Sequence, residues 1–317
     1  MALLATTYNN SFSAILLKQP LQRIGIFCKP GPIENQKLLQ KLVQWLRQKN
    51  LSVFLETDTA RLIGEPSDHS IADVAKEADI IVVLGGDGTL LKVTREVYLS
   101  DTPLLAVNLG NLGFLTDVPR AGLFDALEKV LAGNCKVESR MLLKSYILRD
   151  GKKTEDHYVL NDLVISKGVI ANIVNLEVRV DGQYMTSYRG DGLIVATPTG
   201  STAYSLSAGG PIIHPNIHNL IINPICPCAL TNRPIIIPDD SKIEINLTNA
   251  NEDVRLTFDG QVSCQIKPGD MLNIQKAETT LRLIRVSEKT YYQVLREKLN
   301  WGRATEPEPN ETLDGHK

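Results

Sequence analysis

The sequence predicts an α/β N-terminal domain with a parallel sheet, followed by a mostly antiparallel, β-rich second domain. Strand-like and helix-like stretches alternate through the first third of the chain, as they do in a parallel sheet with helices on both faces. Three Asp-Gly pairs then separate runs of alternating apolar and polar residues, which is a strong hairpin signal. The 317 residues suffice for two domains at about 150 residues each.

The N-terminal domain is expected to begin with a short buried strand and an amphipathic helix. Leu39, Leu42, Val43 and Leu46 recur at the i, i+3, i+4, i+7 spacing of one helix face, and this helix should end near Asn50. Later strands that are apolar on both faces indicate a central sheet covered by helices. The predicted strands are Arg23–Cys28, Ser52–Leu55, Ile80–Leu84 and Pro103–Val107, and two further helices are predicted over Thr89–Tyr98 and Leu123–Leu131.

The second domain is expected to consist of hairpins around Asp150-Gly151, Asp181-Gly182 and Asp259-Gly260. Its predicted strands are Leu142–Leu148, Tyr158–Ser166, Leu176–Val180, Val254–Phe258 and Gln261–Ile266. A final helix over Thr290–Leu299 should return to the first domain. The predicted divisions are a flexible extension (1–21), the α/β domain (22–134), the β-rich domain (135–277), the return (278–301) and a disordered tail (302–317).

Composition excludes several classes of protein. Lys and Arg total 34 and Asp and Glu 36, so the net charge of −2 lacks the basic field that nucleic-acid binders and polybasic membrane proteins use. No apolar run approaches the ~20 residues of a transmembrane helix, and the segment up to Pro20 lacks a secretory signal. Five scattered cysteines indicate reduced thiols rather than a disulfide framework. We therefore expect a cytoplasmic protein with neither nucleic-acid nor membrane partners.

The most informative local feature is the loop Gly85-Gly86-Asp87-Gly88-Thr89, between an apolar strand and a helix. Ligands of parallel α/β sheets bind at the carboxyl ends of the strands, where glycines let the backbone approach a phosphate and the helix offers unpaired N–H groups. The alternative is a tight turn that only requires glycine. Three glycines around one acid at this edge favour a phosphate loop of Gly85, Gly86, Gly88 and Thr89. The P-loop motif is absent, and Leu91 replaces the third glycine of the dinucleotide fingerprint.

Two further clusters follow predicted strands. Asn108–Thr116 is a glycine-rich segment that should share a crevice with the first loop. Arg189–Pro211 is dense in small hydrogen-bonding residues, and such a run can line a ribose or adenine pocket. A turn with a Ser/Thr helix cap is the alternative, but it does not explain the length of the cluster. Asp191 is the carboxylate of this cluster that we expect to face a ligand.

These segments together resemble the NAD kinase (ATP-NAD kinase) family, in particular its bacterial and cyanobacterial members. The resemblance covers roughly Arg23 to Trp301, in the same order and spacing. The glycine loop alone is not specific, since diacylglycerol and sphingosine kinases carry similar loops. The segment from Asp191 to Pro211 is far more specific. The segments that carry the resemblance are Gly85–Thr89, Asn111–Thr116, Asn161-Asp162 and Asp191–Pro211.

The resemblance implies that ATP phosphorylates the 2′-hydroxyl of the adenosine ribose of NAD to give NADP. Asp87 would be the general base, Mg²⁺ or another divalent cation would accompany ATP, and no metal would be held by protein ligands alone. A homo-oligomer, dimer or tetramer, is also implied. The residues implied at NAD are Asp87, Gly88, Lys92, Asn161, Asp162, Asn172, Arg189, Asp191, Thr202, Ala203, Tyr204, Ser205, Leu206, Ser207 and Gln261.

Several points stay open in the sequence. Asp162 stands where the family commonly has Glu, Cys228 stands where it often has His, and Gln261 could equally be a plain hairpin residue. A lipid kinase of the diacylglycerol or sphingosine type is the alternative enzyme, and a non-catalytic NAD- or ATP-sensing protein is the third hypothesis. The presence of Asp87 argues against a non-catalytic sensor. The choices between NAD and NADH, and between ATP and polyphosphate, are not decided.

Overall fold

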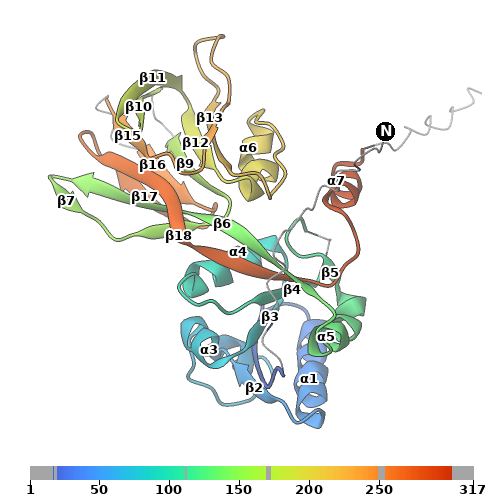
Figure 1. Ribbon diagram of the computed structural model, residues 1–317. Helices are drawn as coiled ribbons and strands as arrows, with labels where there is room; N and C mark the ends of the chain where they lie inside the picture. The colour runs from blue at the N-terminus through green and yellow to red at the C-terminus, as the bar shows by residue number, and fades with distance from the viewer. Residues whose placement is uncertain (1–16, 18–19, 111–112, 169–172, 249–253, 302–317) are drawn as a thin grey trace, which may run out of the picture.

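The computed structural model describes residue 17 and residues 20–110, 113–168, 173–248 and 254–301. The chain forms two parts joined by a pair of long strands (Figure 1). The elements of the first part are β1 (Arg23–Cys28), α1 (Ile33–Gln48), β2 (Ser52–Leu55), α2 (Thr57–Arg61), α3 (Ile71–Glu77), β3 (Ile80–Leu84), α4 (Asp87–Val97), β4 (Leu104–Asn108), β5 (Val118–Pro119), η1 (Arg120–Gly122) and α5 (Leu123–Leu131).

The first part is a three-layer α/β unit. Strands β2, β1, β3 and β4 pair in parallel in that spatial order. Residues of β1 and β3 alternate between the two faces of the sheet: Ile24 and Val82 pack with α1 and α5, whereas Ile81 and Val83 pack with α3 and α4. Gly25 faces α3, where a Cβ atom would press on Val74. The parallel sheet with helices on both faces is confirmed.

The second part is a β-sandwich. Its elements are β6 (Lys136–Arg149), β7 (Lys152–Lys153), β8 (His157–Val159), β9 (Asp162–Lys167), β10 (Val174–Val180), β11 (Gln183–Gly190), β12 (Gly192–Ala196), η2 (Thr199–Thr202), α6 (Tyr204–Ser207), β13 (Asn219–Ile225), β14 (Ile235–Pro238), β15 (Ile243–Leu247), β16 (Val254–Phe258), β17 (Val262–Ile266) and β18 (Met271–Arg285), followed by α7 (Tyr291–Leu299). An antiparallel six-stranded sheet, β14-β13-β12-β9-β16-β17, supplies one layer. Its buried residues, such as Leu163 and Val195, pack against Leu143 and Ile274 of the other sheet.

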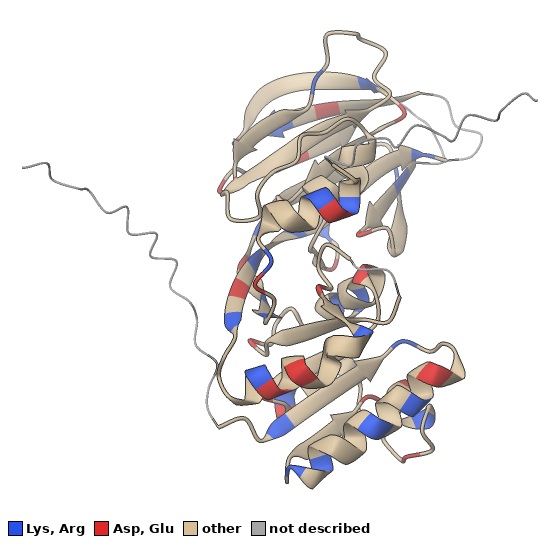
Figure 2. Ribbon diagram, turned by 90° about the vertical axis from the view of Figure 1, so that its right-hand side faces the viewer, with Lys and Arg blue, Asp and Glu red and all other residues tan. Residues whose placement is uncertain are grey.

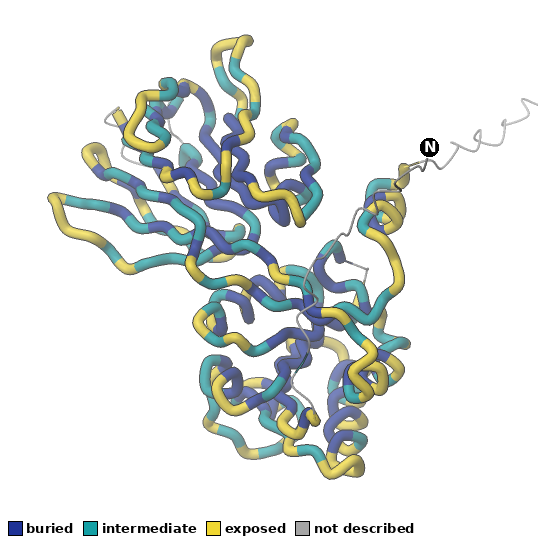
Figure 3. The backbone as a smooth tube through the Cα atoms, in the orientation of Figure 1, coloured by how far each residue is buried: buried dark blue, intermediate teal, exposed yellow. Residues whose placement is uncertain are grey.

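The two parts share one continuous sheet. Strand β18 pairs antiparallel with β6 and β15 in the second part, and its Leu283 pairs in parallel with Leu104 of β4. The resulting mixed sheet has twelve strands and runs from β11 to β2. Figure 3 shows the buried residues following these strands through both parts. The chain thus returns to the first part through β18, while Tyr291 of α7 contacts the ring of His214 in the second part.

The predicted Asp-Gly turns are present. Asp150, Asp181 and Asp259 have φ values of 51°, 52° and 48°, and the glycine after each also has a positive φ, as two-residue hairpins require. One predicted strand was wrong, because residues 158–166 do not form a single strand. They divide at Leu160 into β8, which pairs with β6, and β9, which belongs to the six-stranded sheet.

Charges are distributed without a dominant sign. In Figure 2, acidic and basic residues are interspersed over both parts of the molecule, in agreement with the net charge of −2. Among the described residues, no helix is both long enough and apolar enough to cross a bilayer.

Candidate active site

The glycine loop lies between the buried strand β3 and the first turn of α4. A Cβ atom at Gly85 would collide with the Thr89 side chain, so glycine is required there for the turn to close. A Cβ atom at Gly86 would meet nothing within 4 Å, so the backbone borders open space at the start of α4. The N–H groups of the first turn of a helix lack intrahelical partners and carry positive partial charge. The loop can therefore hold a phosphate.

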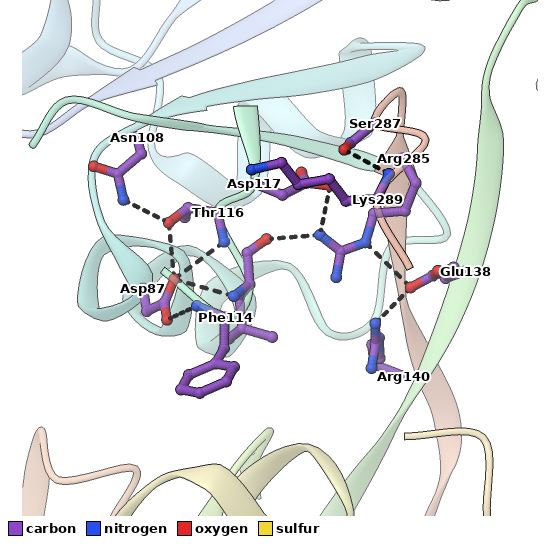
Figure 4. Close-up of polar contacts among 11 residues, drawn as sticks. Asp87, Asn108, Phe114, Thr116, Asp117, Glu138, Arg140, Arg285, Ser287 and Lys289 are labelled. Carbon is purple, nitrogen blue, oxygen red and sulfur yellow. Dashed lines mark hydrogen bonds and ion pairs between the residues drawn. The ribbon is translucent and has the colours of Figure 1, made fainter. Parts of the chain in front are cut away.

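The carboxylate of Asp87 accepts hydrogen bonds from the segment that follows β4. Its Oδ1 accepts hydrogen bonds from the backbone N–H groups of Leu115 (3.2 Å) and Thr116 (3.1 Å) and from the Thr116 hydroxyl (2.8 Å). In the described part of the chain, Oδ2 accepts one bond, from the N–H of Phe114 (2.8 Å). A Cβ atom on Gly113 would overlap Asp87 Oδ1. Figure 4 shows these contacts, which leave Oδ2 as the oxygen with capacity for a substrate.

A buried amide orients the Thr116 hydroxyl. Asn108, at the end of β4, donates from Nδ2 to Thr116 Oγ1 (2.8 Å). The hydroxyl oxygen is thereby used as an acceptor, so its own hydrogen points to Asp87. Asn108 is 3% exposed and Thr116 is fully buried. The structure therefore brings the two predicted clusters into contact, and the second cluster positions the acid of the first.

Gln261 links the second part of the molecule to the glycine loop. Its Nε2 donates to the Gly88 carbonyl (2.5 Å), and its Oε1 accepts from Arg95 of α4 (3.2 Å). Lys92 is exposed on the same helix, with its ammonium 5.3 Å from the Phe27 ring centre. The structure therefore brings together the predicted residues Gly88 and Gln261. Sequence reasoning did not single out Arg95, which lies two turns beyond the loop.

Asp259 holds the Asn161-Asp162 segment in place. Its carboxylate accepts from the backbone N–H groups of Leu160 (2.9 Å), Asn161 (2.7 Å) and Asp162 (3.1 Å). These bonds replace ladder bonds at the point where β8 ends, which is the physical reason for the divided strand. Sequence analysis identified Asp259 only as a turn residue. Because Asp259 and Gln261 share one turn, Asn161 and Asp162 lie next to the Gly88 contact.

Asp162 is a buried carboxyl beside a second one. Burial and the neighbouring Asp259 raise the pKa of Asp162 from 3.8 to about 7, and the N–H of Tyr204 donates to it and opposes that shift. Burial also raises the pKa of Asp259, against the three N–H groups it accepts from. The contact with Tyr204 joins Asn161-Asp162 to the predicted segment of residues 202–207.

That segment packs against the second sheet through Ser205. Ser205 is fully buried, and the side-chain amide of Asn223 donates to its hydroxyl (3.2 Å) and its carbonyl (3.0 Å). Tyr204 and Ser207 are exposed, whereas Thr202, Ala203 and Leu206 are half-buried. A Cβ atom at Gly200 would overlap the carbonyl of Asn161, so glycine permits the close approach of the two segments. The side chain of Ser205 faces the protein rather than the open surface.

Arg189 and Asp191 lie at the other end of strand β12. The strand register pairs Ala196 with Asp162 but Gly192 with Ser166, so Asp191 is about five residues, or roughly 17 Å, away from Asp162 along the sheet. Asp191 forms an ion pair with Lys167 (2.7 Å), and Arg189 is exposed. Asn172 lies outside the described residues. Within this chain, the structure does not bring Arg189 and Asp191 to the glycine loop.

The raised pKa of Asp162 predicts a pH-dependent loss of stability. Above about pH 4 the unfolded chain releases this proton, whereas the folded chain keeps it to about pH 7, so the free energy of unfolding falls as the pH rises between these values. At about 1.4 kcal/mol per pKa unit the effect is a few kcal/mol. The free energy of unfolding of the Asp162→Asn variant should therefore not fall in this way. The difference between variant and parent should be more favourable to the variant at pH 8 than at pH 4.5, as measured by urea unfolding.

Asp58→Asn is the matched control, because Asp58 is exposed and pairs with Arg61 across one helical turn. It should leave the pH slope of the unfolding free energy unchanged. The interpretation fails if Asp162→Asn also retains the slope of the parent.

Family models and named relatives agree on the identity of both parts. The model described as the ATP-NAD kinase N-terminal domain matches residues 24–135, and that of the ATP-NAD kinase C-terminal domain matches residues 160–286. The chain is 47% identical to the NAD kinase of Geotalea daltonii over 282 residues, which cover 89% of this chain and 99% of that protein. It is also 47% identical to the NAD kinase of Syntrophotalea carbinolica over 283 residues, with the same coverage.

Solved structures share the fold. The crystal structure of yeast NADH kinase complexed with NADH superposes with a TM-score of 0.84 at 26% identity, covering 90% of this chain and 89% of that one. An NAD kinase from Archaeoglobus fulgidus in complex with ATP gives a TM-score of 0.71 at 24% identity, covering 88% of this chain and 99% of that one. The predicted order of an α/β part followed by a β-rich part is common to all of them.

Proposed function

We propose that this chain, which belongs to the ATP-NAD kinase family, uses Asp87 as the base that activates the 2′-hydroxyl of the adenosine ribose of NAD for phosphorylation by ATP. The observation that carries the proposal is the hydrogen bonding of Asp87. Three donors bond to Oδ1, whereas among the described residues one donor bonds to Oδ2. A carboxylate fixed in this way can accept a proton at one defined oxygen.

In the proposed reaction the ribose 2′-oxygen forms a bond to the γ-phosphorus of ATP while its proton moves to Asp87 Oδ2. The bond between the γ-phosphorus and the β,γ-bridging oxygen breaks, and ADP leaves. Phosphoryl transfer depends mainly on positioning and charge neutralisation, so the reaction does not require a strong base. The backbone N–H groups at the start of α4 would stabilise the phosphate charge.

The divalent cation is proposed to arrive with ATP. Among the described residues, no group of three or more His, Cys, Asp or Glu side chains is arranged to hold a metal ion. Mg²⁺ is commonly bound by one or two carboxylates together with substrate phosphates and water, so such a cage is not required. The cation would neutralise phosphate charge.

The proposed NAD site extends from the glycine loop along the Gln261 contact to Asn161, Asp162 and the exposed face of residues 202–207. Arg189 and Asp191 lie at the other end of β12 from Asp162, and we propose that a second copy of the chain brings them to the ligand. The homo-oligomer, dimer or tetramer, is therefore part of the proposal. So is a cytoplasmic location, which is supported by the five cysteines, all described and all free.

A coupled assay tests the function. Purified protein is incubated with NAD, ATP and Mg²⁺, and NADP is followed with an NADP-specific dehydrogenase. Parallel reactions replace NAD by NADH, ATP by polyphosphate, and the dinucleotide by diacylglycerol or sphingosine. We expect NADP from NAD and ATP, and no lipid phosphate. If folded protein forms neither NADP nor NADPH, the proposed function is wrong.

A further inference from the structure

A largely buried arginine from the C-terminal end of β18 reaches the back of the loop that holds Asp87. Arg285 donates from Nη1 to the Leu115 carbonyl (3.3 Å) and pairs through the same nitrogen with Asp117 (3.1 Å). Its Nε donates to Glu138 of β6 (3.1 Å). The guanidinium therefore contacts the loop on both sides of Thr116, as Figure 4 shows.

The contact with Leu115 acts on a single peptide unit. The carbonyl that accepts from Arg285 and the N–H of Thr116 that donates to Asp87 belong to the same planar peptide. In a trans peptide these two groups point in opposite directions. Fixing the carbonyl toward Arg285 therefore fixes the N–H toward Asp87.

We propose that Arg285 is a positioning residue, which holds the Leu115–Thr116 peptide so that the Asp87 carboxylate keeps one orientation. This inference rests on the proposed role of Asp87 as the base. Arg285 does not contact the reacting atoms, and its effect passes through the peptide. Loss of a donor to a carboxylate raises the pKa of that carboxylate and loosens its orientation.

Neighbouring charges keep the Arg285 side chain in place. Asp117, Arg285, Glu138 and Arg140 form a row of alternating charge, in which the side chains of Arg285 and Asp117 are 13% and 10% exposed. Burial opposes the charge of Arg285, but Asp117 and Glu138 outweigh it and raise the pKa of the guanidinium. A side chain paired on two sides in a largely buried setting has little rotational freedom, which a positioning role requires.

The test compares four variants. Arg285→Met removes the charge and the planar guanidinium group. Arg285→Lys keeps the charge but cannot reproduce the hydrogen bonds that the planar guanidinium donates from several nitrogens. Because Arg285→Met leaves Asp117 buried without its partner and can unfold the protein, the double variant Asp117→Asn/Arg285→Met restores the charge balance there. Arg282→Met is the matched control, since Arg282 lies three residues earlier on β18 and pairs with the exposed Asp101.

Two readouts distinguish positioning from a structural role. We expect kcat for NADP formation to fall about 10- to 100-fold in the double variant, with KM for NAD changed less than twofold. In the pH profile of kcat for the double variant, the acid limb should move to higher pH. Arg285→Lys should be intermediate, and Arg282→Met should match the parent. Amide hydrogen exchange should accelerate at Leu115 and Thr116 in the double variant but not in the control.

The exchange measurement does not depend on turnover. If the parent makes no NADP, the proposed function fails, and exchange at Leu115 and Thr116 still decides whether Arg285 fixes this peptide. Unchanged exchange in a folded double variant overturns the Arg285 proposal. So does a kcat within twofold of the parent, or an equal loss in Arg282→Met.

Discussion

Replacing Asp87 by Asn is expected to lower kcat for NADP formation roughly a thousandfold, within the range of general base catalysis, while the affinity for NAD changes little. The amide removes the proton acceptor at Oδ2. It also places an NH₂ group where Oδ1 accepts three hydrogen bonds or where Oδ2 accepts from Phe114, so one set of donors loses its partner. Initial rates give kcat, and titration calorimetry gives the dissociation constant of NAD.

Thr116→Val is the matched control for this variant. It removes the hydroxyl that donates to Oδ1 but leaves the carboxylate and Oδ2 in place. Its kcat should fall by less than about tenfold, because one hydrogen bond contributes about 1 kcal/mol net. If Asp87→Asn retains a tenth or more of the parental kcat, Asp87 is not the base.

The Gly113→Ala substitution should lower kcat about a hundredfold without unfolding the protein, because a displacement of about 1 Å at a reacting group has this effect. The new methyl group would overlap both Asp87 Oδ1 and Thr116 Oγ1, so the loop or the carboxylate must move. The change is measured as kcat, and circular dichroism reports whether the fold is retained.

Gly110→Ala provides the comparison within the same loop. A Cβ atom at Gly110 would lie 3.9 Å from Asn108 Oδ1, which is an ordinary contact. This variant should keep a kcat within about threefold of the parent, since substitutions away from special features change little. Equal losses in the two variants would show that the loop tolerates no side chain and would contradict a specific effect on Asp87.

The order of elements could be predicted because it depends on neighbours in the sequence. Leu39, Leu42 and Leu46 repeat at helical spacing, and all three are fully buried on α1. Asp150, Asp181 and Asp259 precede glycine, and each adopts the positive φ that a tight hairpin requires. The glycine loop was predicted from its position between β3 and α4.

Contacts between distant segments could not be predicted in this way. Gln261 meets Gly88 across 173 residues, and Asp259 meets Asp162 across 97. Arg285 and Leu115 are 170 residues apart. No local periodicity reports on such pairs, because each depends on how strands that are remote in the sequence pair and pack. The register of β12 against β9 likewise separates Asp191 from Asp162.

The sequence by itself therefore determined the two-part α/β and β-rich organisation, the glycine loop between β3 and α4, and the family of this protein. Periodicity, turn residues and short motifs depend on the local chain, so they can be read without coordinates. Only the tertiary structure decided how Asp87 is held, why the strand divides at Leu160, and which predicted residues meet in one chain. Those outcomes depend on strand register and on buried hydrogen-bond partners, which the packing of remote segments selects.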